Sequence, residues 1–470
     1  MSISENSSQD QIHRRTFLKY GLSGALAIGG MSAAYASYSA WQRSNARDRQ
    51  PTIILITLDT TRADHLSCYG YHLPTSPNID RLAAEAIVYE NAIASATWTL
   101  PSHASLFTGK FTASHGVCKS GDGSLDLAVP DYGPNAINHY RARPLAAEEQ
   151  TLATLLEASG YQTSAVVAGP WLKDVFGLSR GFETYDDENI ATVNGRLAED
   201  VTNRALQLMS NETAQPRFLF LNYFDAHYPY DPPAEFARQF ASEIVPVSTG
   251  GSSHEIERMV AMYDAEISYM DFHLGRLFDG LRGRQLFDDA WIIVTADHGE
   301  LLGEHSSFGH PGLVYQESVH VPMIVKPPQG HPGARRESGW IQLVDLFPLM
   351  LNAAHIEPPV GIQGSLPSEI DHPIVIESRT LPGINEGGDW FAIIEDGWKF
   401  AWNSEGRHLL FNLGADPNEQ YNLFLQYPMR ARAMGDALHA YLASLPQPGP
   451  ATPARIDKQT QATLKSLGYL

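Results

Sequence analysis

The sequence predicts an α/β fold: a doubly wound, mostly parallel β-sheet flanked by helices, followed by a small α+β subdomain at the C-terminus. Short apolar runs rich in β-branched residues recur along the chain, as expected for buried parallel strands. They alternate with segments of helical character, which is the order of strand–helix–strand units. The chain has 470 residues, 43% of them hydrophobic, so it can bury one large core and a smaller appendage.

The first predicted strand is Thr52–Leu58, a continuous apolar run that stops at Asp59. Further strands are predicted at Gln162–Ala168, Arg217–Tyr223, Ala290–Thr295 and Val321–Val325. Helices are predicted at Leu82–Tyr89, Gln150–Ser159 and His254–Leu286. In sheets of this kind, ligands bind beyond the carboxyl ends of the strands. Asp59 and Asp297 each follow a predicted strand, so the pattern places two carboxylates at that edge.

The chain changes character after Pro358. Short strands are predicted at Pro373–Glu377, Trp390–Glu395 and Trp398–Trp402, and a helix at Met429–Leu445. We therefore expect an α/β domain at 51–357 and an α+β subdomain at 358–470. Within the first domain, the segment Val117–Leu145 is rich in Gly, Pro, Asp and Asn, which predicts a long irregular excursion at the rim of the substrate pocket.

The N-terminus resembles a twin-arginine export signal. Arg14 and Arg15 open the stretch RRTFLK, and a run of small and apolar residues follows and ends in Ala34-Tyr35-Ala36. Residues 1–36 are therefore predicted to be the signal and residues 37–50 a polar linker. A short basic and apolar membrane anchor is the alternative. We expect the export machinery as a partner and a location in the periplasm or on a membrane facing it, with membrane contact only through this segment if it stays uncleaved.

The charge balance excludes some partners. There are 53 acidic residues against 33 basic ones, a formal charge of -20, which argues against nucleic acid and against an anionic membrane surface. An anionic substrate would need a metal ion and local cationic groups to overcome this field. Cys68 and Cys118 are the only cysteines, so a framework of several disulfides is ruled out.

A metal site is indicated by Asp297 and His298. An apolar strand delivers these adjacent carboxylate and imidazole groups into a loop, which suits a divalent cation with mixed oxygen and nitrogen ligands. The alternative is an aspartate turn beside a solvated histidine. Taken alone, Asp59 is as compatible with a helix cap or a turn as it is with a metal ligand.

Thr99 is a candidate nucleophile because of its position. It precedes Leu100-Pro101, and the run Ser102–Phe107 is expected to form a helix with Pro101 in its first turn. The hydroxyl would then lie at a helix N-terminus, where free amides and the positive end of the dipole favour an anionic group. The alternative is an ordinary N-cap threonine.

These residues also carry a family resemblance. The stretch TLPSHASLFTGK from Thr99 resembles the sulfatase signature, in which Cys or Ser is followed by x-Pro-Ser-Arg and then by Leu-x-Thr-Gly-Arg/Lys. The resemblance continues through DTTRADHLSCYGY from Asp59, PNIDRLAAEA from Pro77, the block from Asp297 to His310, and HLLFNLGADPNEQYNL from His408. It implies an alkaline-phosphatase-like fold and covers nearly the whole chain after the linker.

The resemblance implies one divalent cation bound by Asp59, Asp297 and His298, with the Thr99 oxygen coordinated to it. Thr60 stands where the family has a second early aspartate. This loss of ligand charge leaves calcium, magnesium, manganese and zinc all open. His103 replaces the signature arginine, so a fixed cation gives way to a group whose charge depends on pH.

Thr99 itself departs from the family. Sulfatases oxidise Cys or Ser at this position to formylglycine, and threonine has no matching route to that aldehyde. A phosphothreonine can be hydrolysed by water, whereas a sulfothreonine lacks the easy elimination route. The resemblance therefore favours a metal-dependent hydrolase of sulfate or phosphate esters, with phosphoesters preferred.

Four further residues, His227, His310, Lys110 and His115, lie where the family holds the anion or protonates the leaving oxygen. His227 and His310 are expected to act as general acid or anion ligand, together with His103 as a third catalytic histidine, and Lys110 and His115 to bind substrate. The expected substrate is a small or a glycan- or lipid-linked anionic ester. Three alternatives remain: a sulfatase using unmodified threonine, a phosphoryl-headgroup transferase on the same fold, and a non-catalytic binding pseudoenzyme.

Overall fold

The computed structural model describes residues 50–118, 125–130, 137–190, 195–211, 213–240, 252–310, 312–379 and 387–449. The predicted export signal, and the predicted linker except Gln50, lie outside these residues. Pro51–Leu470 forms a compact unit of its own. Among the described residues, no helix combines the length and the apolar character needed to cross a membrane.

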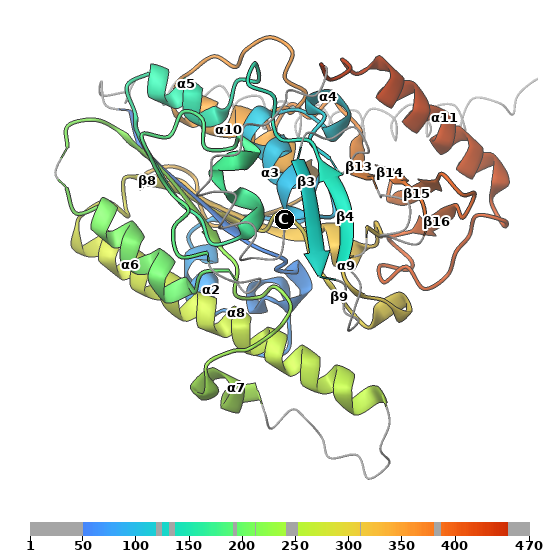
Figure 1. Cartoon of the computed structure of the whole chain (residues 1–470), viewed down its shortest axis with the longest axis horizontal. Coiled ribbons are helices and arrows are strands. Elements are labelled where there is room, and N and C mark those ends of the chain that lie inside the picture. The colour runs from blue at the N-terminus through green and yellow to red at the C-terminus, as the bar shows by residue number, and fades with distance from the viewer. Residues whose placement is uncertain are drawn as a thin grey trace, which may run out of the picture. The chain divides into compact units, whose positions relative to one another are not determined.

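A large mixed sheet organises the fold (Figure 1). Within the described residues it has eight strands, in the order β12 (Arg335–Gln342), β2 (Ile87–Ile93), β11 (His320–Lys326), β8 (Ala290–Thr295), β1 (Thr52–Leu58), β7 (Arg217–Tyr223), β5 (Gln162–Val166) and β6 (Thr184–Asp186). Strand β11 is antiparallel to both its neighbours, and the other neighbouring pairs are parallel. The predicted mostly parallel sheet is confirmed.

Helices cover the sheet on both faces. The α-helices of the described residues are α2 (Pro77–Ala83), α3 (Thr99–Thr108), α4 (Thr112–His115), α5 (Leu152–Ala158), α6 (Ala198–Leu208), α7 (Ala234–Phe240), α8 (Ser252–Gly283), α9 (Gln316–Val319), α10 (Leu346–Ala353) and α11 (Pro428–Ser444), of which α11 belongs to the C-terminal subdomain. Successive residues of β1 alternate between two cores, Ile53 and Leu55 in one and Ile54 and Ile56 in the other. Helices α3, α5 and α10 contribute to the first core, and α2, α6 and α8 to the second.

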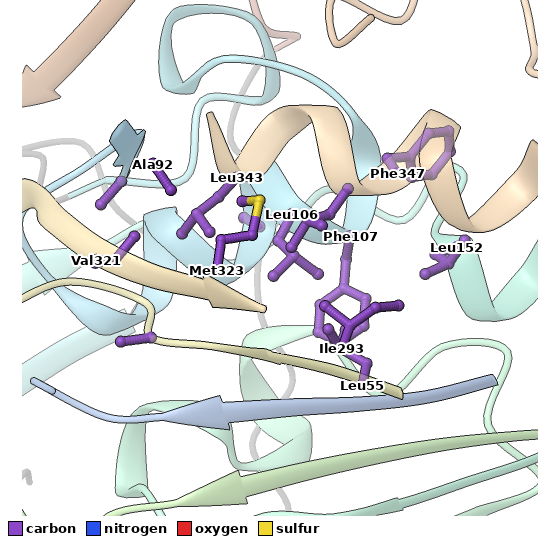
Figure 2. Packing of buried hydrophobic residues seen from close by; sticks show 14 of the residues in the cluster. Leu55, Ala92, Leu106, Phe107, Leu152, Ile293, Val321, Met323, Leu343 and Phe347 are labelled. Carbon is purple, nitrogen blue, oxygen red and sulfur yellow. The ribbon is translucent and has the colours of Figure 1, made fainter. Parts of the chain in front are cut away.

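Helix α3 is anchored to the sheet by large apolar side chains. Figure 2 shows Leu106 and Phe107 of α3 packed near Leu55 of β1 and Ile293 of β8. All four are fully or almost fully buried. Such packing fixes the position of α3 over the two central strands, and with it the position of Thr99 at the N-terminus of the helix.

Two sequence expectations for local structure are wrong. The predicted helix Leu82–Tyr89 is divided, since α2 ends at Ala83 and Ile87–Ile93 is strand β2. The β-branched and aromatic residues there pair with β11 and β12, so tertiary pairing overrides local propensity. The predicted irregular segment Val117–Leu145 contains an antiparallel pair, β3 (Leu125–Pro130) and β4 (Ile137–Ala142).

The predicted α+β subdomain at the C-terminus is confirmed. In the described part of this region, β13 (Ile374–Ser378), β14 (Trp390–Glu395), β15 (Trp398–Asn403) and β16 (Leu409–Asn412) form an antiparallel sheet. Helix α11 lies on this sheet (Figure 1) and shares a core with it. The backbone N–H of Glu377 donates to the carbonyl of Ser95 at 3.0 Å, which connects β13 to the segment before α3. A domain boundary at residue 357 stays a prediction.

A buried ion pair ties this subdomain to the larger sheet. Lys399 in β15 is 1% exposed, and its Nζ lies 2.9 Å from Oε1 of the buried Glu419. Oε2 of Glu419 accepts a hydrogen bond from the backbone N–H of Gln316, at the start of α9, at 2.7 Å. The carbonyl of Ser318 in α9 accepts from the N–H of Gly299 at 2.9 Å. The pair therefore supports the loop that follows β8.

Lys399→Met is expected to lower the free energy of unfolding by about 3–5 kcal/mol, because it leaves the Glu419 carboxylate buried without its cation. Urea unfolding followed by circular dichroism measures this change. Arg335 and Glu337 form a matched exposed pair, both 43% exposed, and Arg335→Ala is expected to cost less than about 1 kcal/mol. If Lys399→Met has the same free energy of unfolding as wild type, then the buried pair does not hold the subdomain in place.

Candidate active site

Two neighbouring strands deliver the acidic residues of the site. Strand β1 ends at Leu58 and is followed by Asp59, and β8 ends at Thr295 shortly before Asp297 and His298. The two strands are parallel neighbours, with Thr57 opposite Thr295, so their carboxyl ends lie side by side. Asp59, Asp297 and His298 are fully buried. The predicted position beyond the carboxyl edge of the sheet is thus what the structure shows.

Thr99 lies beside this group. It is the first residue of α3, with Trp98 as N-cap residue and Pro101 in the first turn. Its Oγ1 lies 3.4 Å from Nε2 of His298, and its side chain is almost fully buried. The hydroxyl therefore lies at a helix N-terminus and next to the strand-end residues, as the sequence predicts.

Asp59, Asp297 and His298 have the geometry of a cation site. One donor atom from each can be chosen so that all three lie within 4.8 Å of one another. Among the described residues, neither oxygen of Asp59 nor Oδ2 of Asp297 accepts a hydrogen bond of good geometry. Burial raises the pKa of Asp59, and the charges of Asp297 and Glu300 raise it further, although the nearby side chains of Asn222 and Thr99 oppose this weakly.

A divalent cation would offset these costs. Buried carboxylates with free oxygens are unfavourable unless they are paired or bind metal. Oδ1 of Asp297 accepts from the N–H of Thr60 at 3.2 Å and from that of His298 at 2.9 Å, which leaves Oδ2 available. Nδ1 of His298 lies 2.9 Å from the carbonyl of Gly299 and so carries the proton, which leaves Nε2 as the ligand nitrogen. The residues present fit a metal of the O/N-binding type.

Thr60 supplies no carboxylate, and its hydroxyl is engaged elsewhere. Its Oγ1 lies 2.8 Å from the carbonyls of both Asp59 and Ala226. Its backbone has φ 53°, a left-handed conformation that is unfavourable for a β-branched residue. The hydrogen bonds hold this turn and connect the loop after β1 with the loop after β7.

His227 and His310 lie together although they are far apart in the sequence. Their Nε2 atoms are 3.1 Å apart, and the ring of His310 lies 4.7 Å from that of His298. Nδ1 of His227 donates to the carbonyl of Tyr228 at 2.6 Å, and burial lowers the pKa of His227 to about 4. Because Nδ1 of His227 donates to a carbonyl, a neutral His227 ring would have its Nε2 lone pair available to accept a proton from Nε2 of His310.

Lys110 lies just beyond the end of α3, and His115 is the last residue of the following helix, α4. Nζ of Lys110 lies 2.7 Å from Oε2 of Glu149. Nε2 of His115 lies 3.0 Å from Oγ of Ser105, and its Nδ1 accepts from the N–H of Val117 at 3.0 Å; burial lowers its pKa to about 3. The 10 residues of α3, about 15 Å along the helix axis, separate Thr99 from Lys110, and the substrate-binding role of both residues stays a prediction.

Glu300 and Asn222, two residues without a predicted role, also belong to the site. Glu300 is buried, accepts a hydrogen bond from the hydroxyl of Tyr230, and has its pKa raised to about 8 by burial. Asn222, fully buried in β7, contacts Thr57 and the backbone after β5. A polar residue within the apolar run of β7 is a signal that could have identified Asn222.

A buried group of residues that fits a cation lies at the carboxyl edge of the sheet, with a hydroxyl at a helix N-terminus beside it, and this arrangement is typical of an ester hydrolase. Comparison with known families agrees with this class. Residues 51–356 match the family model named Sulfatase. The chain therefore belongs to the sulfatase family.

Relatives and solved structures support the same assignment. The chain is 23% identical to an arylsulfatase of Clostridium perfringens over 80% of this chain and 90% of that protein. It is 25% identical to the multifunctional alkaline phosphatase superfamily protein PehA of Trinickia caryophylli, over 79% and 90% respectively. The crystal structure of the phosphonate monoester hydrolase of Agrobacterium radiobacter is similar in fold, with a TM-score of 0.65, 20% identity, and coverage of 84% of this chain and 95% of that one.

Proposed function

We propose that this protein is a metal-dependent hydrolase of sulfate or phosphate esters with Thr99 as nucleophile, and that it prefers phosphoesters. The observation that carries the proposal is the placement of Thr99 Oγ1, which lies 3.4 Å from Nε2 of His298 at the N-terminus of α3. A hydroxyl at this position faces both the cation-binding residues and the positive end of a helix dipole. Both favour an anionic ester.

Asp59, Asp297 and His298 would hold the cation. When bound, a divalent cation stabilises the charge that develops on the ester and lowers the pKa of a neighbouring hydroxyl. The chain's own groups do the rest. The N-terminus of α3 orients the anionic group, and Thr99 Oγ1 attacks phosphorus and loses its proton as the new O–P bond forms.

The His227–His310 pair is proposed to handle the proton of the leaving group. It has one Nε2 proton between two imidazoles 3.1 Å apart, close enough to His298 to reach the same substrate. The pair accepts the proton that Thr99 loses and, as the P–O bond to the alcohol breaks, one histidine of the pair passes this proton to the departing oxygen. A water activated by the same pair then hydrolyses the phosphothreonine and restores the Thr99 hydroxyl.

The preference for phosphoesters follows from the chemistry of threonine. Hydrolysis of a phosphothreonine needs only attack by water at phosphorus, whereas release of sulfate from a formylglycine relies on collapse to an aldehyde that threonine cannot form. PehA is named as a multifunctional protein of the alkaline phosphatase superfamily, and the Agrobacterium enzyme is named as a hydrolase of phosphonate monoesters, not of sulfate esters. They support phosphorus chemistry as compatible with this fold.

The purified protein should be assayed with nitrophenyl sulfate, a nitrophenyl phosphate monoester, a phosphodiester and a phosphonate monoester, each with Ca²⁺, Mg²⁺, Mn²⁺ and Zn²⁺. We expect stoichiometric binding of one cation and higher kcat/KM for a phosphorus ester than for the sulfate. Turnover of the sulfate alone would contradict the phosphoester preference. Turnover that requires an added alcohol acceptor would indicate a transferase, and the absence of a bound cation would indicate a pseudoenzyme.

We further propose that the substrate is met outside the cytoplasm, as a small or a glycan- or lipid-linked anionic ester. The paired Arg14 and Arg15 and the apolar stretch after them support export by the twin-arginine machinery. The net charge of -20 supports a discrete anionic group held by a local cation rather than a polyanionic surface.

A further inference from the structure

His103 lies in the first turns of α3 and is fully buried. Its Nδ1 lies 2.9 Å from the carbonyl oxygen of Thr99, and its Nε2 lies 3.0 Å from Oγ1 of Thr57. A carbonyl oxygen can only accept a hydrogen bond, so Nδ1 of His103 must carry a proton. The ring is thus attached directly to the backbone of the proposed nucleophile.

The partners of Asn222 set the direction of the next hydrogen bonds. Its Oδ1 accepts from the N–H of Gly169 at 2.8 Å and from that of Ala168 at 3.2 Å. These two donors fix the orientation of the amide group, so Nδ2 is the atom that faces Thr57, at 3.2 Å from Oγ1. Because Thr57 Oγ1 accepts this N–H, its own proton is free to point at His103.

The direction of the last hydrogen bond follows from matching donors with acceptors. Nε2 of the fully buried His103 ring lies 3.0 Å from Thr57 Oγ1, and it can accept the hydroxyl proton that the N–H of Asn222 cannot accept. With Nε2 as the acceptor, the Thr57 hydroxyl and both ring nitrogens of His103 each have a partner.

We propose that His103 is a positioning residue, and that hydrogen bonds from Asn222 to Thr57 and from Thr57 to His103 hold its ring so that Nδ1–H donates to the Thr99 carbonyl. This relay, defined as Asn222, Thr57 and His103, fixes the first turn of α3 and so aims the Thr99 hydroxyl. The inference rests on the proposed role of Thr99 as nucleophile. It replaces the expectation that His103 is a catalytic group whose charge depends on pH.

A second contact at the same turn has the same effect. Oγ of Ser102 donates to the carbonyl of Asp297 at 2.6 Å, so the start of α3 is tied both to β1, through Thr57, and to the loop after β8. The side chain of Asn222 also lies close to Asp59. The relay and the Ser102 contact together connect the start of α3 to β1 and to the loop after β8, which supply the cation-binding residues, and errors in this geometry would displace Thr99 relative to them.

The tautomer can be tested directly on the metal-loaded full-length protein. Nuclear magnetic resonance of protein with ¹⁵N-labelled histidine rings should show His103 protonated at Nδ1 only from pH 6 to pH 8. A His103→Asn protein, which lacks one set of ring signals, assigns the resonance. Protonation at Nε2 alone, or at both nitrogens, would overturn the relay.

Kinetics test the positioning role. Thr57→Val keeps the shape of the side chain but removes the hydroxyl, and we expect it to lower kcat by about 10- to 100-fold through misplacement of the nucleophile, with KM changed by less than about 3-fold. Thr57→Ser restores the hydroxyl and is expected to recover most of the loss. His103→Asn places an amide N–H near the position of Nδ1 and is expected to recover much of the kcat that His103→Ala loses.

These outcomes separate the two proposals. Equal kcat in Thr57→Val and wild type, or equal losses in His103→Asn and His103→Ala, would overturn the positioning role. If Thr57→Val does not fold, as judged by circular dichroism, the two His103 variants and the wild-type tautomer decide the matter. Failure of the wild-type protein to turn over any ester would overturn the proposed function and with it the role of His103, whereas a wrong tautomer overturns the relay alone.

Discussion

Thr99→Ala is expected to lower kcat by on the order of 10⁴-fold, because it removes the atom that forms the covalent intermediate. KM should change little, since the cation site and the N-terminus of α3 still bind the anionic group. The metal content should stay at one cation per chain, because Asp59, Asp297 and His298 remain. Steady-state kinetics with the best ester, together with metal analysis of the same preparation, measure both quantities.

The control variant is Thr99→Ser, which keeps a hydroxyl at the same position and is expected to retain most of the activity. Acid quenching of wild type during turnover, followed by mass spectrometry, should find phosphate on the peptide that contains Thr99. If Thr99→Ala turns over the ester at the wild-type rate with metal bound, then water attacks directly and the scheme with a covalent intermediate is wrong.

The central strands could be predicted from the sequence almost to the residue. The bounds of β1, β7 and β8 agree with the predicted runs, because strands buried on both faces are apolar throughout and stop where the chain leaves the core. Strand β2 could not be recognised in the same way. A short apolar run suits a helix or a strand equally, and pairing with β11 and β12, which lie more than 200 residues later, decides it.

The site shows the same division between local and distant information. Asp59 and Asp297 could be placed because each directly follows a strand. The contact between His227 and His310 spans 83 residues, and no local pattern reports it. The substrate-binding role of Lys110 comes from the family resemblance and stays a prediction, because its closeness to Thr99 in sequence does not imply closeness in space. The helix between them carries Lys110 away from the nucleophile and toward Glu149.

The surroundings of Thr99 indicate how the site can bind an anionic ester although position 103 carries no permanently charged side chain. Where the sulfatase signature has arginine, His103 donates to a backbone carbonyl of the same helix. In the proposed mechanism, positive charge for an anionic ester would come from a cation held by Asp59, Asp297 and His298 and from the dipole of α3. Activity should accordingly depend more strongly on the metal than it would in a site with a permanent cation.

Asp59→Asn is expected to lower metal affinity by at least about 100-fold and, unexpectedly, to raise the melting temperature of the metal-free protein at neutral pH. Burial and the charges of Asp297 and Glu300 raise the pKa of Asp59 in the folded state. The folded metal-free protein thus binds more protons than the unfolded chain, so its stability falls as the pH rises above the ordinary value of 3.8. Asparagine has no charge to bury and escapes this loss.

Added metal should reverse the order of the two melting temperatures, so that wild type melts above Asp59→Asn. A cation at 100 times its Kd stabilises wild type by about 2.7 kcal/mol, whereas Asp59→Asn gains far less. Melting curves at pH 4 and pH 7, with chelator and with metal, separate the two effects.

Asp271 is a matched control, because burial raises its pKa to about 6 while its oxygens accept from the N–H groups of Asn78 and Ile79. Metal should stabilise wild type and Asp271→Asn equally. Should Asp59→Asn melt below wild type in chelator at pH 7, then Asp59 carries no electrostatic cost that a cation relieves, and the cation site must be placed elsewhere.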